Sequence, residues 1–157
     1  MKHSLKQKAV LIALVMSCTT AFAQNAADKI LGTYSVVSDA TKEKVKVRIS
    51  KQGNTYRAQI VWMEKPLDDK GQPKRDILNP NPALRSVTGD KIVLAWDLKY
   101  DSKANEWSGG KIYDPDTGKT YKATFTLESP TKLKVRGYIG LPALGRTMEW
   151  KKIDGDN

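Results

Sequence analysis

Histidine and cysteine are nearly absent from this chain, which has one of each among 157 residues. Both of them, His3 and Cys18, lie in the first 23 positions. The remaining residues therefore exclude Ser-His-Asp and Cys-His catalysis, zinc or haem sites with His or Cys ligands, and disulfides. Paired carboxylates need no histidine, but the loop acids Asp68, Asp69 and Asp76 alternate with Lys and Arg, which is typical of solvated acids. We expect no enzymatic activity, no cofactor and no metal.

The first 23 residues have the pattern of a secretory signal peptide. Three lysines without an acid precede an apolar run at 9–16, and Ala21-Phe22-Ala23 offers small residues for cleavage after Ala23. The run is far shorter than the ~20 residues of a membrane-spanning helix. We therefore expect a periplasmic or secreted protein that does not span a membrane. Lipidation at Cys18 is the less favoured alternative, because Met16 fits a lipoprotein site poorly.

Acidic residues are in the minority along residues 24–157, where 24 Lys and Arg face 17 Asp and Glu. In an exported protein, this excess points away from nucleic acid and toward anionic lipid head groups, lipopolysaccharide or acidic glycans. We expect no nucleic acid partner, and a weak contact with the cell envelope is consistent with the charge.

Helical periodicity is lacking as well, and period-two alternation takes its place, as in strands with one buried face. The clearest case is 44–50, where Val45, Val47 and Ile49 alternate with Lys and Arg. The eight expected strands are 30–38, 44–50, 55–63, 92–98, 107–114, 121–128, 132–140 and 145–152.

Eight strands joined mostly by short connections predict a closed sheet. An antiparallel sheet of this size can close on itself, and its interior then holds side chains or one small ligand. We predict an all-β fold, an eight-stranded antiparallel up-and-down barrel that forms a single domain over residues 24–157. A β-sandwich is the alternative.

One connection, residues 64–90, is much longer than the others and contains four of the seven prolines. Proline-rich segments do not form strands, and a loop of this length in a compact domain usually has a function or lacks order. We interpret it as a lid that gates the barrel, or equally as a plug that closes one end.

Several sequence blocks in one order resemble the exported bacterial family called domain of unknown function 2147. This resemblance covers nearly all of residues 24–157 and implies a lipocalin-like calycin barrel, with no established catalytic activity. The blocks are Ile30-Leu31-Gly32-Thr33-Tyr34, Ile60-Val61-Trp62 with Asp68 and Gly71, Asn79-Pro80-Asn81-Pro82 with Leu84-Arg85, Gly109-Gly110-Lys111-Ile112-Tyr113-Asp114-Pro115, and Leu133-Lys134-Val135-Arg136-Gly137-Tyr138 through Leu144-Gly145-Arg146-Thr147.

The lipocalin resemblance implies a Trp on the first strand, stacked under an Arg or Lys of the last strand. Here Gly32-Thr33-Tyr34 places Tyr34 where that Trp is usual. Arg146, Met148 and Trp150 share one face of the last expected strand. We expect Tyr34, Arg146 and Trp150 to close the barrel, with Arg146 stacked on Tyr34 or a nearby Trp. The alternative role for Arg146 is to anchor a ligand.

Inward positions of the expected strands supply the candidate ligand contacts. We predict that the barrel binds a small apolar or amphipathic molecule non-covalently. The alternative is a filled barrel that binds an envelope polyanion or a protein partner through its basic face and the apolar tip at 140–145. The predicted ligand-binding residues are Tyr56, Ile60, Trp62, Leu94, Trp96, Phe125, Arg146 and Met148.

Overall fold

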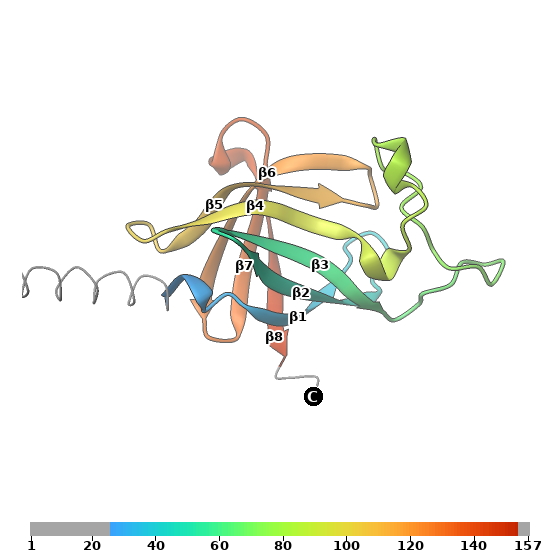
Figure 1. Ribbon diagram of the computed structural model, residues 1–157, viewed down its shortest axis with the longest axis horizontal. Coiled ribbons are helices and arrows are strands. Elements are labelled where there is room, and N and C mark those ends of the chain that lie inside the picture. Colours follow the sequence, from blue (N-terminus) through green and yellow to red (C-terminus); the bar gives the residue numbers. More distant parts are fainter. Residues whose placement is uncertain (1–25, 154–157) are drawn as a thin grey trace, which may run out of the picture.

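The computed structural model describes residues 26–153, so the expected leader and its cleavage site lie outside the described residues. Eight antiparallel strands follow one another around a closed barrel, and the last pairs with the first (Figure 1). This arrangement confirms the predicted up-and-down barrel. The strands are β1 (Gly32–Val37), β2 (Lys44–Gln52), β3 (Thr55–Met63), β4 (Val93–Asp101), β5 (Glu106–Asp114), β6 (Lys119–Ser129), β7 (Lys132–Tyr138) and β8 (Arg146–Ile153).

Short 3-10 helices interrupt the connections at one end of the barrel. They are η1 (Pro82–Leu84) and η2 (Gly89–Lys91) before β4, and η3 (Pro142–Leu144) between β7 and β8. No helix among residues 26–153 is long and apolar enough to cross a membrane.

Alternation places the core inside the barrel, as β2 shows. Val47 and Ile49 are almost fully buried, whereas Arg48 between them is exposed. Branched apolar side chains at every second position fit a pleated surface that is buried on one side only. The same logic fills the barrel from all its strands.

Aromatic rings occupy one half of the barrel interior. Trp107, Trp150, Tyr34 and Phe125 are each at most 1% exposed. The Phe125 and Trp150 ring centroids are 5.5 Å apart in a T-shaped pair, and those of Tyr34 and Trp150 are 6.4 Å apart. Rings packed edge to face fill space efficiently, so this half is a packed core.

The segment 26–31 closes the barrel at the aromatic half. Three ring donors reach it, because Trp107 Nε1 donates to the Ala27 carbonyl at 3.0 Å and the Tyr34 hydroxyl to the Ile30 carbonyl at 2.7 Å. The third, the Tyr56 hydroxyl, donates to Asp28 Oδ1 at 2.6 Å. We call this the closed end and the opposite end the open end. Figure 1 shows the 64–90 segment extending from the open end.

Two predicted inward residues, Trp62 and Trp96, lie on the outer wall instead. Between β2 and β3 the register shifts after Lys46, so that Trp62 pairs with Lys46 and is 43% exposed. In β4 the pairing with β3 shifts by one residue between Val93 and Ala95, so that Trp96 pairs with Lys111 on the outer face, and a second irregularity at Asp97, with φ of 58°, returns Leu98 to the inner face. An extra residue in one strand reverses the alternation beyond it, which is why both indoles point outward.

Arg146 does not close the barrel. It is the first residue of β8, lies at the open end with a side chain that is 75% exposed, and pairs with Asp39 at 2.8 Å. The cation next to Tyr34 is Lys152, whose Nζ lies 5.8 Å from the ring centroid. Arg146 and Lys152 are six positions apart along β8, about 20 Å, so Arg146 is too far from Tyr34. Trp150 is buried beside Tyr34.

Candidate functional site

The 64–90 segment has an internal structure of its own. Its two arms run side by side, since the Gly89 amide donates to the Lys74 carbonyl at 2.8 Å and the Asp76 amide to the Val87 carbonyl at 3.0 Å. Outside the segment, Lys74 also pairs with Glu43 of the β1–β2 connection at 2.8 Å. The segment is therefore a folded strap, and we call it the strap from here on.

Asp76 fastens the strap to the outside of the barrel. This residue is 4% exposed, and its Oδ1 accepts a hydrogen bond of 2.6 Å from the hydroxyl of Tyr113 on β5. Its Oδ2 accepts a hydrogen bond of 2.7 Å from the side-chain amide of Asn79. Burial, followed by the Asp76 hydrogen bond, raises the pKa of Tyr113 above its ordinary value. Ile112 shares the inner face with Ala95 and Tyr121, so Tyr113 belongs to the outer face.

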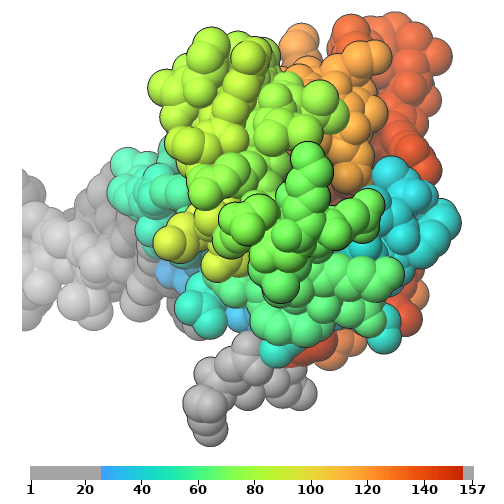
Figure 2. Space-filling view, turned by 90° about the vertical axis from the view of Figure 1, so that its right-hand side faces the viewer, coloured from blue at the N-terminus to red at the C-terminus, as the bar shows by residue number. Residues whose placement is uncertain are grey.

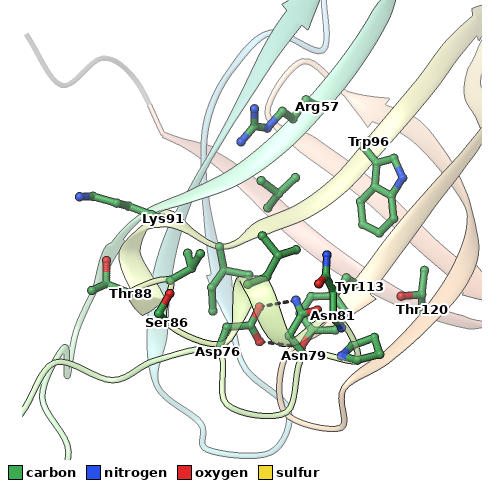
Figure 3. A pocket seen from close by; sticks show the side chains of 15 residues that line it. Arg57, Asp76, Asn79, Asn81, Ser86, Thr88, Lys91, Trp96, Tyr113 and Thr120 are labelled. Atoms are coloured by element: carbon green, nitrogen blue, oxygen red, sulfur yellow. Dashed lines mark hydrogen bonds between the residues drawn. The ribbon is translucent and has the colours of Figure 1, made fainter.

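A hollow of about 780 Å³ lies between the strap and the outer faces of β3, β4 and β5 (Figure 3). Its apolar lining comes from Trp96 and Val93 of the barrel wall and from Leu84 and Val87 of the strap. We call it the side pocket. Because Trp96 faces outward, its indole forms part of this lining and not of the barrel core.

The irregularity at Asp97, directly after Trp96, depends on a glycine in the neighbouring strand. A Cβ atom at Gly110 would collide with the backbone oxygen of Trp96 and the backbone nitrogen of Leu98. Only glycine allows the two backbones to approach this closely. Gly110 therefore helps to position one wall of the side pocket.

Two residues that line the side pocket each carry a buried polar atom without a hydrogen-bond partner within residues 26–153. These atoms are Arg57 Nε and Thr88 Oγ1. The third such atom is Nε1 of Trp150, inside the barrel. Buried polar groups in proteins are nearly always hydrogen-bonded, so these three atoms are exceptions among the described residues.

The charges around the side pocket are predominantly positive. Arg57 and Lys91 line it together with a single acid, Asp76. Both Asp76 oxygens accept hydrogen bonds from Tyr113 and Asn79. The pocket thus combines an apolar wall with cationic donors. Residues 26–153 contain no cluster of three or more Asp, Glu, His or Cys side chains that could hold a metal.

Residues 32–152 match the family model described as an uncharacterized protein conserved in bacteria, DUF2147. This chain belongs to the DUF2147 family. It is also similar to a solved structure, protein HP1028 of the human pathogen Helicobacter pylori, which is described as a member of the lipocalin family. The two share 28% identity over 80% of this chain and 83% of the other, with a TM-score of 0.65. Among curated proteins, none matches the chain.

In this DUF2147 chain the eight predicted ligand-binding residues do not form one site. Tyr56, Ile60, Leu94 and Phe125 are buried in the barrel, and their role as ligand contacts stays a prediction. The other four lie apart from them. Trp96 lines the side pocket, Met148 lines a second hollow, and Trp62 and Arg146 are exposed.

The second hollow marks a gap in the wall of the DUF2147 barrel. Only three residue pairs join β1 to β8, from Thr33 to Ser35 on the β1 side, so the strands separate beyond Ser35. The hollow there has a volume of about 500 Å³ and is lined by Val36 and Met148 among others. It is smaller and more polar than the side pocket.

Sequence reasoning missed Arg57, Thr88, Lys91 and Tyr113. Arg57 alternates with inward residues and therefore resembled an ordinary surface charge. The one signal was the strap itself, whose length and prolines indicated a functional loop but not what it covers.

Proposed function

We propose that this protein is an exported, non-enzymatic binding protein that holds a small apolar or amphipathic molecule in the side pocket. One observation carries the proposal: a hollow of about 780 Å³ between the strap and the barrel wall is lined mainly by apolar side chains, with Arg57, Lys91 and Asp76 as its charged residues. Ligand sites in proteins typically have volumes of about 300–1,000 Å³, apolar walls and a few fixed polar groups. The lipocalin-like fold supports a binding role without specifying the ligand.

The filled interior supports the side pocket over the barrel lumen. A ligand in the closed half would have to displace rings that are at most 1% exposed, such as Phe125 and Trp107. Rearranging a packed core costs about 1–3 kcal/mol or more. The side pocket needs no such displacement, because its space lies between the strap and the wall.

Trp96 provides the direct test of the side pocket. The neutral fluorescent probe N-phenyl-1-naphthylamine is titrated into the purified protein, with Trp96→Ala compared against Trp62→Ala. Removing a Trp wall should weaken binding about tenfold, roughly 1.4 kcal/mol, whereas Trp62 is an outer-wall Trp that does not line the pocket. Equal binding by wild type and Trp96→Ala would contradict the proposal. Native mass spectrometry of protein purified from its own periplasm then identifies a bound molecule.

A second candidate function, contact with an envelope partner, is favoured by the hairpin between β7 and β8. Ile139, Leu141 and Leu144 are 67–80% exposed there. Arg136 holds this tip outward, since its Nε donates to the Pro142 carbonyl at 2.6 Å and its Nη2 to the Ala143 carbonyl at 3.0 Å. An apolar tip contact should persist at high salt, whereas polyanion contacts through lysines should weaken. Envelope binding measured at low and high salt, with Leu144→Ser as the tip variant, separates the two.

A further inference from the structure

We infer that the apolar tip at 140–145, with the adjoining Ile139, inserts into the surface of a lipid bilayer that has anionic head groups. This inference rests on the second candidate function proposed above, an envelope contact, and specifies its partner as lipid. Figure 1 shows the β7–β8 connection, in red, projecting from the barrel apart from the strap.

The tip presents large apolar side chains to solvent. Ile139, Leu141 and Leu144 are 72%, 67% and 80% exposed. Pro142 and Ala143, between the two leucines, are exposed as well. Turns in water are dominated by Gly, Pro, Asn, Asp and Ser, so three large aliphatic side chains in one connection are unusual. Their transfer from water to hydrocarbon is favourable in proportion to their area.

Three consecutive backbone carbonyls of the tip are already hydrogen-bonded within the hairpin. The Leu141 carbonyl accepts a hydrogen bond from the Leu144 amide at 3.1 Å. Arg136 supplies the next two, because its Nε donates to the Pro142 carbonyl at 2.6 Å and its Nη2 to the Ala143 carbonyl at 3.0 Å. A backbone group without a partner is costly in lipid. These internal bonds therefore lower the cost of moving the tip out of water.

A row of side chains at the base of the tip suits anionic head groups. On the outer face of the barrel, Tyr138 of β7 lies opposite Lys122 of β6, and Lys122 lies opposite Lys111 of β5. Both lysines are exposed, and no Asp or Glu within residues 26–153 forms an ion pair with either. Like charges directly opposite each other in a sheet repel, and an anionic surface relieves that repulsion. Tyrosine is enriched at membrane interfaces, and lysine is attracted to anionic lipids.

The dimensions of the tip favour lipid over a protein partner. A stable protein interface buries about 800 Å² on each partner, whereas the large exposed apolar groups of this hairpin are three side chains. Leu141 is three residues beyond Tyr138, at most about 10 Å along the chain. Apolar segments at a bilayer surface enter it by about 5–10 Å. With Tyr138 at the level of the head groups, the leucines therefore reach the acyl chains.

Sedimentation of the purified protein with lipid vesicles tests the inference. We expect binding to mixed vesicles of phosphatidylcholine and phosphatidylglycerol, and weaker binding to phosphatidylcholine alone. The double variant Leu141→Ser/Leu144→Ser should weaken binding to the mixed vesicles about tenfold or more, because it removes two apolar side chains from the tip. The matched control is Leu67→Ser, which removes an exposed leucine of the strap and should leave binding unchanged.

The lysine row is tested with the same vesicles. Lys111→Gln/Lys122→Gln should weaken binding to the mixed vesicles about tenfold or more and leave binding to phosphatidylcholine unchanged. Raising the salt concentration should act in the same direction. Lys99→Gln serves as the control, because it removes an exposed lysine that lies opposite Ser108 and outside the row.

A tryptophan reporter keeps the inference falsifiable where a serine variant fails to fold. The fluorescence of Leu144→Trp should shift to shorter wavelength on addition of mixed vesicles, beyond any shift of wild type. Absence of that shift, or vesicle binding that the leucine variant leaves intact, would overturn the inference. Tip-dependent binding to envelope fractions without binding to vesicles would also overturn it, and the envelope contact would then involve a protein. Titration of N-phenyl-1-naphthylamine without vesicles tests the side pocket independently.

Discussion

The two ends of the barrel differ in how their aromatic and apolar groups are used. At the closed end, hydroxyl and indole donors of Tyr34, Tyr56 and Trp107 all bond to the segment 26–31. At the open end, large apolar side chains are left in solvent. Among residues 26–153 the exposed ones, all at this end, are Val37, Trp62, Leu67, Ile77, Leu78, Leu84, Ile139, Leu141 and Leu144.

Figure 2 looks onto the open end, with the green strap in front and the cyan β1–β2 and red β7–β8 connections beside it. Exposed apolar groups gathered on one side of a protein usually mark a surface of interaction. The contrast indicates that the closed end supplies stability and the open end supplies the surfaces available for binding. The predictions below test that division.

The largest expected effect is at the closed half. Phe125→Ala should lower the free energy of unfolding by about 3–5 kcal/mol, because it leaves a cavity among fully buried rings. Trp62→Ala at the open end removes a larger ring but should change the free energy by no more than about 0.5 kcal/mol. Urea unfolding followed by circular dichroism measures both. Similar losses in the two variants would show that the ends contribute equally.

An intermediate effect is expected where the strap meets the wall. Tyr113→Phe removes the donor to buried Asp76 Oδ1 and should cost about 1–3 kcal/mol. It should also speed proteolytic cleavage within the strap while the barrel fragment survives. The matched control is Tyr121→Phe on β6, whose hydroxyl has no hydrogen-bond partner within residues 26–153. If the strap of Tyr113→Phe resists protease as wild type does, Asp76 is not its main anchor.

The smallest effect is a dependence of stability on pH. The hydrogen bond from Tyr56, followed by that from Lys51, holds the pKa of Asp28 below its ordinary value of about 4. The folded-state pKa is thus the lower one. The stabilisation is complete above the unfolded pKa and is lost as pH falls through the folded value.

Two variants compare this pH dependence at the two ends. Asp28→Asn should flatten the decline of the urea midpoint between about pH 6 and pH 3. At the open end, the hydrogen bond from Lys74 lowers the pKa of Glu43 in the same direction. Glu43→Gln should leave the urea midpoint nearly unchanged and alter only the protease sensitivity of the strap at low pH. A larger midpoint change for Glu43→Gln than for Asp28→Asn would reverse the assignment of roles.

The barrel was predictable because its signal is local. Alternation such as Val45, Val47 and Ile49 against Lys and Arg needs only the chain's own neighbours to specify an inner and an outer face. Eight such segments, mostly with short connections, leave few ways to pair other than in order around a closed sheet. The family resemblance pointed to the same barrel. The family match over residues 32–152 confirms that resemblance.

The misplaced tryptophans mark where local alternation ends. Trp62 and Trp96 were assigned inward by counting every second residue, and each lies beyond a register shift. For Trp96, the second shift, at Asp97, is possible because the neighbouring strand has glycine at position 110. A strand's own sequence does not record which residue of its neighbour lies opposite.

Arg146 and Lys152 show the same limit at the seam of the barrel. Both are cations of β8 on the same side of the alternation, and the sequence favoured Arg146 as the partner of Tyr34. The pairing of Tyr34 with Lys152 follows from how far β8 slides along β1 when the sheet closes. This stagger belongs to the whole barrel, because all eight strands contribute to it.

Composition and alternation were sufficient to specify an all-β fold of eight strands and to exclude chemistry that needs histidine or cysteine beyond residue 23. Closure, bulges and the folding of the strap decided where the pocket lies, outside the wall and next to Arg57, Thr88 and Trp96. The reason is physical. A face is set by neighbours along one strand, whereas a pocket requires residues far apart in the chain to be positioned by contacts that form only when the sheet is complete.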